Sequence, residues 1–400
     1  MTQRELFLLH NAQTSNAPLA IHISKAKGEY LFDTDGKQYL DLISGISVAN
    51  IGHGHPAVVE AIARQAEQYM HVMVYGELVQ SPQVLYAQAL AEHLAPSLSC
   101  VYFTNSGSEA TEGAMKLAKR ATRRSKIISF KNSYHGSTQG ALSVMGSEYW
   151  QQAYRPLLPD VYQYDYESEE SIQAIDSSTA CVILELVQSE AGVLLPHAQW
   201  LHRIRQACTE HGALLIVDEI QTGFGRTGTL FRFQALDLLP DILLLGKALG
   251  GGMPMGAFVA SHHLMAQLSD NPVLGHITTF GGHPVCCAAG LAAWNVLIQS
   301  TIVTKVATKE ALFVSLLHHP AIVSLHSAGL LIALELESPQ FAKQVIDRCI
   351  ENGLFTDWFL FASQSIRIAP PLTITEEQIQ WACHTLLEAI DYVISKRMNQ

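Results

Sequence analysis

The run Leu245-Gly246-Lys247-Ala248-Leu249-Gly250-Gly251-Gly252 ends an apolar stretch with a lysine set among small residues. It follows Asp218-Glu219-Ile220-Gln221-Thr222-Gly223 by the length of one strand–helix–strand unit. An amine at the end of a buried strand can form a Schiff base if its pKa is low enough to leave part of it neutral. A carboxylate at a neighbouring strand end is what a protonated pyridine nitrogen requires. Lys247 and Asp218 therefore predict a site for Schiff-base chemistry at one edge of a sheet.

Short apolar runs alternate with longer helix-like segments through the middle of the chain. The runs are 101–103, 126–130, 181–185, 213–218 and 241–245. Continuous apolar strands are buried on both faces, so they predict an α/β fold with a mostly parallel sheet. Such sheets bind ligands at the carboxyl ends of their strands. The candidate residues Asp218 and Lys247 lie at or just after the ends of two of these runs.

The 400 residues suffice for more than one structural unit. We expect residues 1–48 to form an N-terminal segment that is part of a small domain, 49–300 a large ligand-binding domain, and 301–400 a C-terminal small α+β domain. A hairpin is expected around Asp33-Thr34-Asp35-Gly36-Lys37. After residue 299 we expect a helix, two strands within 322–336, and a final helix from 376 to about 396.

Composition narrows the partners. A net charge of −11 argues against nucleic acid or an anionic membrane as the main partner. No secretory leader and no uninterrupted apolar stretch of about 18 residues is visible, so we expect a cytoplasmic protein. The seven cysteines show no C-x-x-C spacing and are expected to be reduced. The eighteen histidines form no H-E-x-x-H or Cys/His motif, and no metal is expected.

Thr104-Asn105-Ser106-Gly107-Ser108-Glu109-Ala110 turns from a strand into a helical pattern. Amides of a first helical turn, a glycine that permits close approach and two hydroxyls can bind a phosphate. The alternative is an ordinary serine N-cap followed by a glutamate.

Tyr134 and His135 follow the next strand, at the same expected edge of the sheet. The Tyr134 ring can stack on a heterocycle. As isolated residues, the two are more typical of a packed core. The shared edge with Lys247 and Asp218 favours the functional interpretation.

The stretch Gly223-Phe224-Gly225-Arg226-Thr227-Gly228 matches the dinucleotide pattern G-x-G-x-x-G. That pattern requires glycines directly after a strand and a helix that opens from them. Here four residues intervene after the strand, no clear helix start follows, and the next strand leads to Lys247. An NAD-linked dehydrogenase is therefore disfavoured.

The ordered set of motifs resembles the class III pyridoxal-phosphate aminotransferases closely. This ω-aminotransferase group includes acetylornithine, ornithine, 4-aminobutyrate and diaminopelargonate aminotransferases. The resemblance covers nearly the whole chain and implies fold type I, the aspartate-aminotransferase-like fold. Its landmarks are residues 45–48, 52–56, 105–110, 134–136, 185–192, 218–228, 246–247, 279–282 and 367–371.

The resemblance implies a role for each matching position. Lys247 would hold pyridoxal 5′-phosphate as a Schiff base and then move the substrate proton as general base and acid. Asp218 would pair with the pyridinium nitrogen. Gln221 would bind the ring's phenolic oxygen, and Tyr134 and Ile220 would cover the two faces of the ring.

The same resemblance assigns the phosphate and the assembly. Gly107 and Ser108 would contact the phosphate, and Thr279 would reach it from the neighbouring subunit. That role of Thr279 implies a homodimer with composite active sites.

Three positions concern the substrate. Arg367 would clamp the α-carboxylate of the keto acid or amino acid, and Glu190 would pair with Arg367 when an uncharged group takes its place; a structural ion pair is the alternative. Ser137 stands where many relatives that act on ornithine, acetylornithine or 4-aminobutyrate carry an arginine for the substrate carboxylate. A hydroxyl does not replace that fork, so donors with an uncharged or cationic distal end become more plausible. His283 stands where asparagine is frequent.

We expect an aminotransferase that exchanges an amino group between an ω-amine or amino-acid donor and 2-oxoglutarate or pyruvate by a ping-pong mechanism. A pyridoxal-phosphate-dependent aminomutase or decarboxylase of the same fold is the main alternative. A non-catalytic cofactor-binding protein is the alternative from another class.

Overall fold

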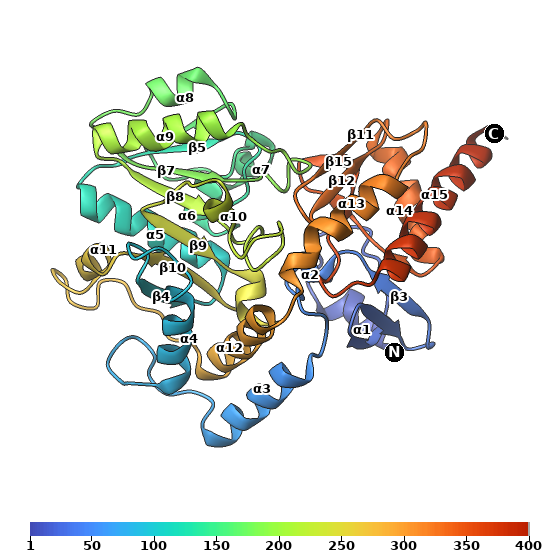
Figure 1. Cartoon of the computed structure of the whole chain (residues 1–400), viewed down its shortest axis with the longest axis horizontal. Helices are drawn as coiled ribbons and strands as arrows, with labels where there is room; N and C mark the ends of the chain where they lie inside the picture. The colour runs from blue at the N-terminus through green and yellow to red at the C-terminus, as the bar shows by residue number, and fades with distance from the viewer. Residues whose placement is uncertain (399–400) are drawn as a thin grey trace.

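The computed structural model describes residues 1–398, which form two lobes lying side by side, with both chain ends in the right-hand lobe of Figure 1. The larger lobe is built on a seven-stranded sheet. Strands β5 to β9 run parallel to one another, whereas β10 is antiparallel to both strands beside it, β4 and β9. The mostly parallel sheet is therefore confirmed. In spatial order the strands are β4 (Cys100–Thr104), β10 (Gly256–Ala260), β9 (Ile242–Leu245), β8 (Leu214–Asp218), β7 (Thr179–Glu185), β5 (Lys126–Phe130) and β6 (Val161–Tyr164).

Helices cover both faces of this sheet, as its apolar strands require. Ile216 of β8 belongs to the core cluster that includes the buried side of α5 (Gly107–Thr122). Its neighbours Leu215 and Val217 belong to the cluster that includes α9 (Ala198–His211). Side chains alternate between the faces of a strand, so one β8 strand contributes to both cores and leaves its last residue, Asp218, at the edge.

Three further helices complete the base of the large lobe, and shorter helices connect its strands (Figure 1). Helix α12 packs against both α3 and α4. The longer helices are α3 (Pro56–Gln68), α4 (Ser81–Ala91) and α12 (Pro284–Gln299), and the short ones are α6 (Gln139–Ser143), α7 (Glu148–Gln151), α8 (Glu169–Gln173), α10 (Arg232–Ala235) and α11 (His262–Met265).

The smaller lobe holds two four-stranded sheets. The expected hairpin is present, with Phe32 paired to Gln38. Strand β3 also pairs in parallel with β13, so residues near the two ends of the chain share one sheet. The exact domain boundaries stay predictions. The first sheet contains β1 (Ile23–Lys27), β2 (Tyr30–Asp33), β3 (Gln38–Asp41) and β13 (Leu354–Phe355), and the second contains β11 (Ser324–Ser327), β12 (Ile332–Glu335), β15 (Ala362–Ile368) and β14 (Trp358–Phe359).

Helices complete the small lobe, and several of them were not expected from the sequence. Helix α14 (Pro339–Glu351) begins at a Ser338 cap that accepts a hydrogen bond from the Phe341 amide. Its buried side chains recur every three or four residues, which is the signal that could have revealed it. The expected helices around it are present. The other helices are α1 (Gln3–His10), the short α2 (Ser44–Ser47), α13 (Val306–Leu316) and α15 (Glu376–Met398).

Candidate active site

Lys247 lies just after β9 and begins the single turn Lys247–Gly250. Its φ of 50° is in the left-handed region, which residues other than glycine rarely adopt and which is enriched at functional sites. The Nζ atom donates a hydrogen bond to Gln221 Oε1 at 3.2 Å. Burial lowers the pKa of this amine, although Glu190 and Asp218 act to raise it. The shift has the direction that the sequence argument required of a reactive amine.

Asp218 is the last residue of β8 and is 5 % exposed. Its Oδ1 accepts a hydrogen bond from the Ile220 amide at 2.9 Å, and its Oδ2 lies 2.7 Å from His135 Nδ1. The sequence placed His135 at this edge but not in contact with Asp218. The buried Nε2 of His135 has no partner within residues 1–398. The carboxylate is therefore held from two sides.

The sequence allowed two interpretations of the turn before α5, a phosphate-binding turn and an ordinary serine N-cap. Ser106 is an N-cap whose Oγ accepts a hydrogen bond from the Glu109 amide at 3.2 Å. The Ser108 Oγ accepts a hydrogen bond from the Ser137 amide at 3.1 Å, an acceptor role that leaves its hydroxyl hydrogen to point elsewhere. Gly107 and Ser108 occupy the first helical turn, whose amides have no partner inside the helix. The serine cap is therefore present on Ser106, and the phosphate contacts of Gly107 and Ser108 stay a prediction.

These elements surround one cavity with an empty volume of about 630 Å³. Lys247 is the only lysine or arginine among its lining residues. The lining comprises Ser106, Gly107, Ser108, Tyr134, His135, Gly136, Glu185, Val187, Ser189, Asp218, Ile220, Gln221, Thr222 and Lys247. All seven positions expected around the cofactor within one chain are therefore brought together.

Glu185 is a cavity carboxyl to which the sequence assigned no role. It ends β7 in direct register with Asp218 on β8, and its Oε2 accepts a hydrogen bond from the Tyr134 amide at 3.2 Å. Burial and the adjacent Asp218 raise its pKa well above the usual range. Burial and the neighbouring carboxyl at the paired strand end therefore both favour the protonated form of Glu185.

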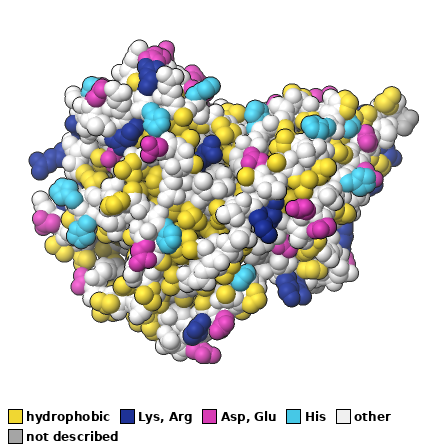
Figure 2. Space-filling model, in the orientation of Figure 1, with side chains coloured by type: hydrophobic (Ala, Val, Ile, Leu, Met, Phe, Trp, Pro, Cys, Tyr) yellow, Lys and Arg dark blue, Asp and Glu magenta, His cyan; other side chains and the backbone are white. Residues whose placement is uncertain are grey.

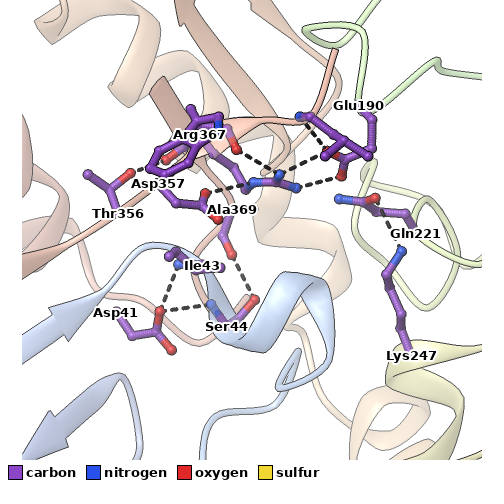
Figure 3. A network of polar contacts seen from close by, with 12 residues as sticks. Asp41, Ile43, Ser44, Glu190, Gln221, Lys247, Thr356, Asp357, Arg367 and Ala369 are labelled. Carbon is purple, nitrogen blue, oxygen red and sulfur yellow. Dashed lines mark hydrogen bonds and ion pairs between the residues drawn. The ribbon is translucent and has the colours of Figure 1, made fainter. Parts of the chain in front are cut away.

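Arg367 and Glu190 form a buried two-point ion pair beside the cavity (Figure 3). Nη1 donates to Oε1 at 2.8 Å and Nη2 to Oε2 at 3.0 Å. Burial opposes ionisation of Glu190, but Arg367 outweighs it and lowers the pKa of the carboxyl. Figure 3 places Gln221 next to Glu190, with Lys247 beyond it. A second carboxylate, Asp357, also contacts Arg367, and the sequence gave no sign of it.

Ser137 and Thr279 lie outside the cavity lining. The Ser137 Oγ is 3.2 Å from the Tyr134 hydroxyl, so it adjoins the site. Thr279 is exposed on the surface of its own chain, and its contact with a neighbouring subunit stays a prediction. His283 stacks on His71 with ring centroids 5.5 Å apart, and we have no functional account of it.

The G-x-G-x-x-G run does not form a dinucleotide loop. Residues after β8 form turns, and the next helix is the four-residue α10. Arg226 is fully buried and donates to the carbonyls of Leu330 and Pro370 and to Asn50 Oδ1. The run therefore ties the large lobe to the small one.

The described residues contain no group of three or more His, Cys, Asp and Glu side chains that could hold a metal ion. In the same part of the chain no single helix is long and apolar enough to cross a membrane, although α12 and α13 meet that test jointly across a 57° bend.

Sequence comparison decides the family. The chain matches the class-III aminotransferase family over residues 11–390. It belongs to this family. The fold and enzyme class expected from the motifs are thereby confirmed, and this aminotransferase uses pyridoxal phosphate.

Individual relatives agree along the whole aminotransferase chain. The acetylornithine aminotransferase of Methanopyrus kandleri is 36% identical over 395 residues, which cover 98% of this chain and 99% of the relative. That of Bacillus subtilis is 37% identical and covers 92% and 95%. Among solved structures, an ornithine aminotransferase of Toxoplasma gondii with partial occupancy of PLP superposes with a TM-score of 0.91 at 30% identity, covering 99% and 96%.

The cavity of this aminotransferase fits pyridoxal phosphate chemically. A buried amide nitrogen, Gln221 Nε2, has no partner among the described residues and lies on the amide that Lys247 contacts. The missing side chain of Gly136 also lets its backbone lie against Ser108, since a Cβ there would be 2.0 Å from Ser108 Oγ. An amine, a carboxylate and a helix N-terminus thus surround one space, matching an aldehyde, a pyridine nitrogen and a phosphate.

Proposed function

We propose that this aminotransferase transfers an amino group from an amine or amino acid with an uncharged or cationic distal end to 2-oxoglutarate or pyruvate, in two half-reactions of a ping-pong cycle. The observation that carries the proposal is the buried Lys247 amine in one cavity with Asp218 and the α5 N-terminus. When bound, pyridoxal phosphate supplies an aldehyde for the amine and a protonated ring that accepts electrons.

The protein's own residues bind the cofactor and transfer the proton. Lys247 would tether the cofactor. Once displaced by the donor amine, it would move the proton from the carbon that bears the amino group to the carbon of the cofactor aldehyde, and in the opposite direction in the acceptor half-reaction. Asp218, held by His135, fixes negative charge beside the ring nitrogen. Gly107 and Ser108 hold the phosphate at the α5 N-terminus.

The remaining cavity residues orient the ring. Gln221 would donate to its phenolic oxygen through Nε2, which has no partner within residues 1–398. Tyr134 and Ile220, which both line the cavity, cover its two faces.

Arg367 and Glu190 let one site accept two kinds of substrate. Glu190 covers the guanidinium while a donor without a carboxylate at this position is bound. It leaves when the carboxylate of the keto acid takes the same two donors. The charged pair therefore matches a cycle in which an uncharged group and a carboxylate alternate at one place.

The donor class follows from Ser137. The relatives' names make acetylornithine and ornithine the first donors to test. Lys247 is nevertheless the only lysine or arginine among the described cavity-lining residues, and Ser137 offers only a hydroxyl. We therefore expect acetylornithine and 4-aminobutyrate to be poor donors compared with alkyl amines and diamines.

A donor screen with two variants tests this. Loss of the yellow absorbance of the cofactor-loaded enzyme reports the donor half-reaction for 1-aminobutane, 1,4-diaminobutane, acetylornithine and 4-aminobutyrate. Ser137→Arg is expected to speed the half-reaction of acetylornithine about tenfold, because it adds a carboxylate fork, whereas Ser137→Ala is not. Rapid turnover of acetylornithine by the parent enzyme contradicts the donor class. Turnover that needs no keto acid contradicts transamination and favours the aminomutase or decarboxylase.

The assembly we propose is a homodimer with composite sites. Exposed apolar side chains cluster in residues 70–85 and 273–280, beside a groove with an empty volume of about 710 Å³ that Thr278 helps to line. Figure 2 shows apolar side chains on the lower left of the molecule, over α4 and α12. The exposed residues include Met70, Met73, Leu78, Val79, Val84, Leu85, Val273, Leu274, Ile277 and Phe280.

Subunit complementation tests this assembly. A Lys247→Ala subunit still carries Thr279, and a Thr279→Ala subunit still carries Lys247. If Thr279 serves the neighbouring site, mixed dimers contain one intact site and regain tight cofactor binding and activity. Mixed dimers that form but regain neither contradict the composite site.

We also propose a cytoplasmic location, which the seven free cysteines, six of them buried, support.

A further inference from the structure

The guanidinium of Arg367 is held on a second edge, away from Glu190. Its Nε donates to Asp357 Oδ1 at 2.8 Å, and its Nη2 donates to the Trp358 carbonyl at 3.1 Å (Figure 3). Its plane also lies over the Phe359 ring, 4.5 Å from the centroid. Arg367 is 3 % exposed, so solvent does not replace these partners.

The backbone around Asp357 makes this contact rigid. The Arg367 amide donates to the Asp357 carbonyl at 2.8 Å, and the Thr356 hydroxyl donates to the Arg367 carbonyl. Asp357 and Arg367 are thus hydrogen-bonded through their main chains and through their side chains. Both lie at the hairpin of β14 and β15, an element that belongs to the small lobe, whereas Glu190 comes from the large lobe.

We propose that Asp357 is a positioning residue for the acceptor half-reaction: it fixes the guanidinium so that the Nη1–Nη2 edge faces Glu190 and the carboxylate that displaces it. The inference rests on the proposed role of Arg367 as the clamp for the keto acid. Fork geometry requires a fixed plane, because both parallel hydrogen bonds are lost when the plane turns.

Asp357 also keeps Arg367 paired while Glu190 is away. Removing one partner of a buried ion pair is costly because it leaves an uncompensated charge. With Asp357 on Nε, the departure of Glu190 leaves a neutral Arg–Asp pair. Glu190 has a second anchor, since its Oε2 accepts a hydrogen bond from the Leu360 amide at 3.0 Å.

The loss of the Asp357 charge alone would favour keto-acid binding, which is opposite to the effect of lost orientation. This electrostatic effect on keto-acid binding largely cancels. Removing its charge strengthens the attraction of Arg367 for the keto acid, but it strengthens the attraction for Glu190 as well. Because the two carboxylates compete for the same edge, their relative affinity changes little. The loss of orientation remains, and it weakens acceptor binding.

The test compares Asp357→Ala, Asp357→Asn and Arg367→Gln in the loaded enzyme. Asp347→Asn is the control, because Asp347 is a partly exposed carboxylate of the same lobe, paired with Lys343. The measurements are the KM of pyruvate, the donor half-reaction with 1-aminobutane, and the Kd of unreactive glutarate by thermal shift. Melting temperature and cofactor absorbance verify folding.

Asp357→Ala is expected to raise the KM of pyruvate and the Kd of glutarate about tenfold, the size of one lost charge-assisted hydrogen bond. Asp357→Asn keeps an oxygen acceptor and recovers most of this loss. The donor half-reaction changes by a much smaller factor. Unchanged constants in Asp357→Ala, or equal losses in both half-reactions, overturn the proposal. If Arg367→Gln leaves the constants unchanged, the clamp itself is wrong; if only Arg367→Gln raises them, the clamp stands and the role of Asp357 falls.

Discussion

Lys247 Nζ donates a hydrogen bond to Gln221 Oε1 at 3.2 Å, so an amine after β9 and an amide after β8 meet in one cavity. The amide holds the amine without adding a charge. Burial can therefore lower the pKa of Lys247 instead of being offset by a directly bonded carboxylate. This contact therefore orients the Lys247 amine, the proposed nucleophile, without a directly bonded carboxylate.

Replacing Lys247 by alanine should abolish turnover while leaving the fold intact. We expect a fall in activity of at least about 10³-fold, because both the tether and the proton-transferring group are lost. Borohydride should fix the cofactor covalently to the parent chain but not to Lys247→Ala, as intact-protein mass shows. Lys343→Ala, which removes an exposed lysine, is the control. Covalent fixation in Lys247→Ala would assign the Schiff base to another lysine.

Asp218→Asn should bind the cofactor but slow both half-reactions by about 10²–10³-fold, because a fixed charge beside the ring is replaced by a dipole. Stopped-flow absorbance measures the two rates. Asp165→Asn removes an exposed carboxylate that pairs with Lys131 and serves as the matched control. Equal rates in Asp218→Asn and the parent exclude the proposed pairing with the ring nitrogen.

Positions that follow apolar strands were predictable from the sequence. The runs that end at Asp218 and before Lys247 mark strands by their burial pattern, and parallel strands bring their carboxyl ends to one edge. The Ser106 cap was predictable because the residue lies where a strand turns into a helix. The same turn leaves the free amides on which the predicted phosphate contacts of Gly107 and Ser108 depend.

Contacts between distant side chains were not predictable in the same way. The pairing of Asp218 with His135 and of Arg367 with Asp357 depends on strand register and hairpin geometry, which residue patterns leave open. Strand β10 runs antiparallel between two apolar strands, and an apolar run carries no sign of direction. The raised pKa of Glu185 likewise follows from its register with Asp218.

Gly107→Ala should weaken cofactor binding, with little effect on stability. A Cβ at this position would lie 2.8 Å from Ile220 Cδ1, so Ile220 must move, and it also lines the cavity. We expect about a tenfold rise in the Kd of pyridoxal phosphate, equivalent to about 1.4 kcal/mol. Fluorescence titration of the apoenzyme measures it.

The contrasting variant for Gly107 lies on the same helix. A Cβ on Gly113 would lie 2.3 Å from Phe258 Cε1 in the core. Gly113→Ala should therefore lower the melting temperature and leave the cofactor Kd of the folded protein unchanged. If both variants weaken cofactor binding alike, the effect at Gly107 is not local to the cavity.

Glu219 should make stability depend on pH. It is fully buried, and it accepts hydrogen bonds from the amides of Arg232 and Phe233 at 2.9 and 2.7 Å and from the Thr222 hydroxyl. Burial outweighs these bonds and raises the pKa of Glu219 from 4.5 to about 7. The folded protein thus holds a proton that the unfolded chain has released.

The sign of this dependence follows from linkage. Because the folded pKa is the higher one, the protonated form contributes stability below pH 4.5, and that contribution is lost as pH rises through about 7. A shift of this size corresponds to about 3 kcal/mol. Glu219→Gln has no such titration, so its deficit relative to the parent should shrink by about 2–3 kcal/mol between pH 5 and pH 8. The difference in melting temperature between parent and Glu219→Gln, taken at both pH values, measures this. Other titrating groups are common to both proteins and cancel, so a constant difference would mean that Glu219 is ionised in the fold at pH 5 already.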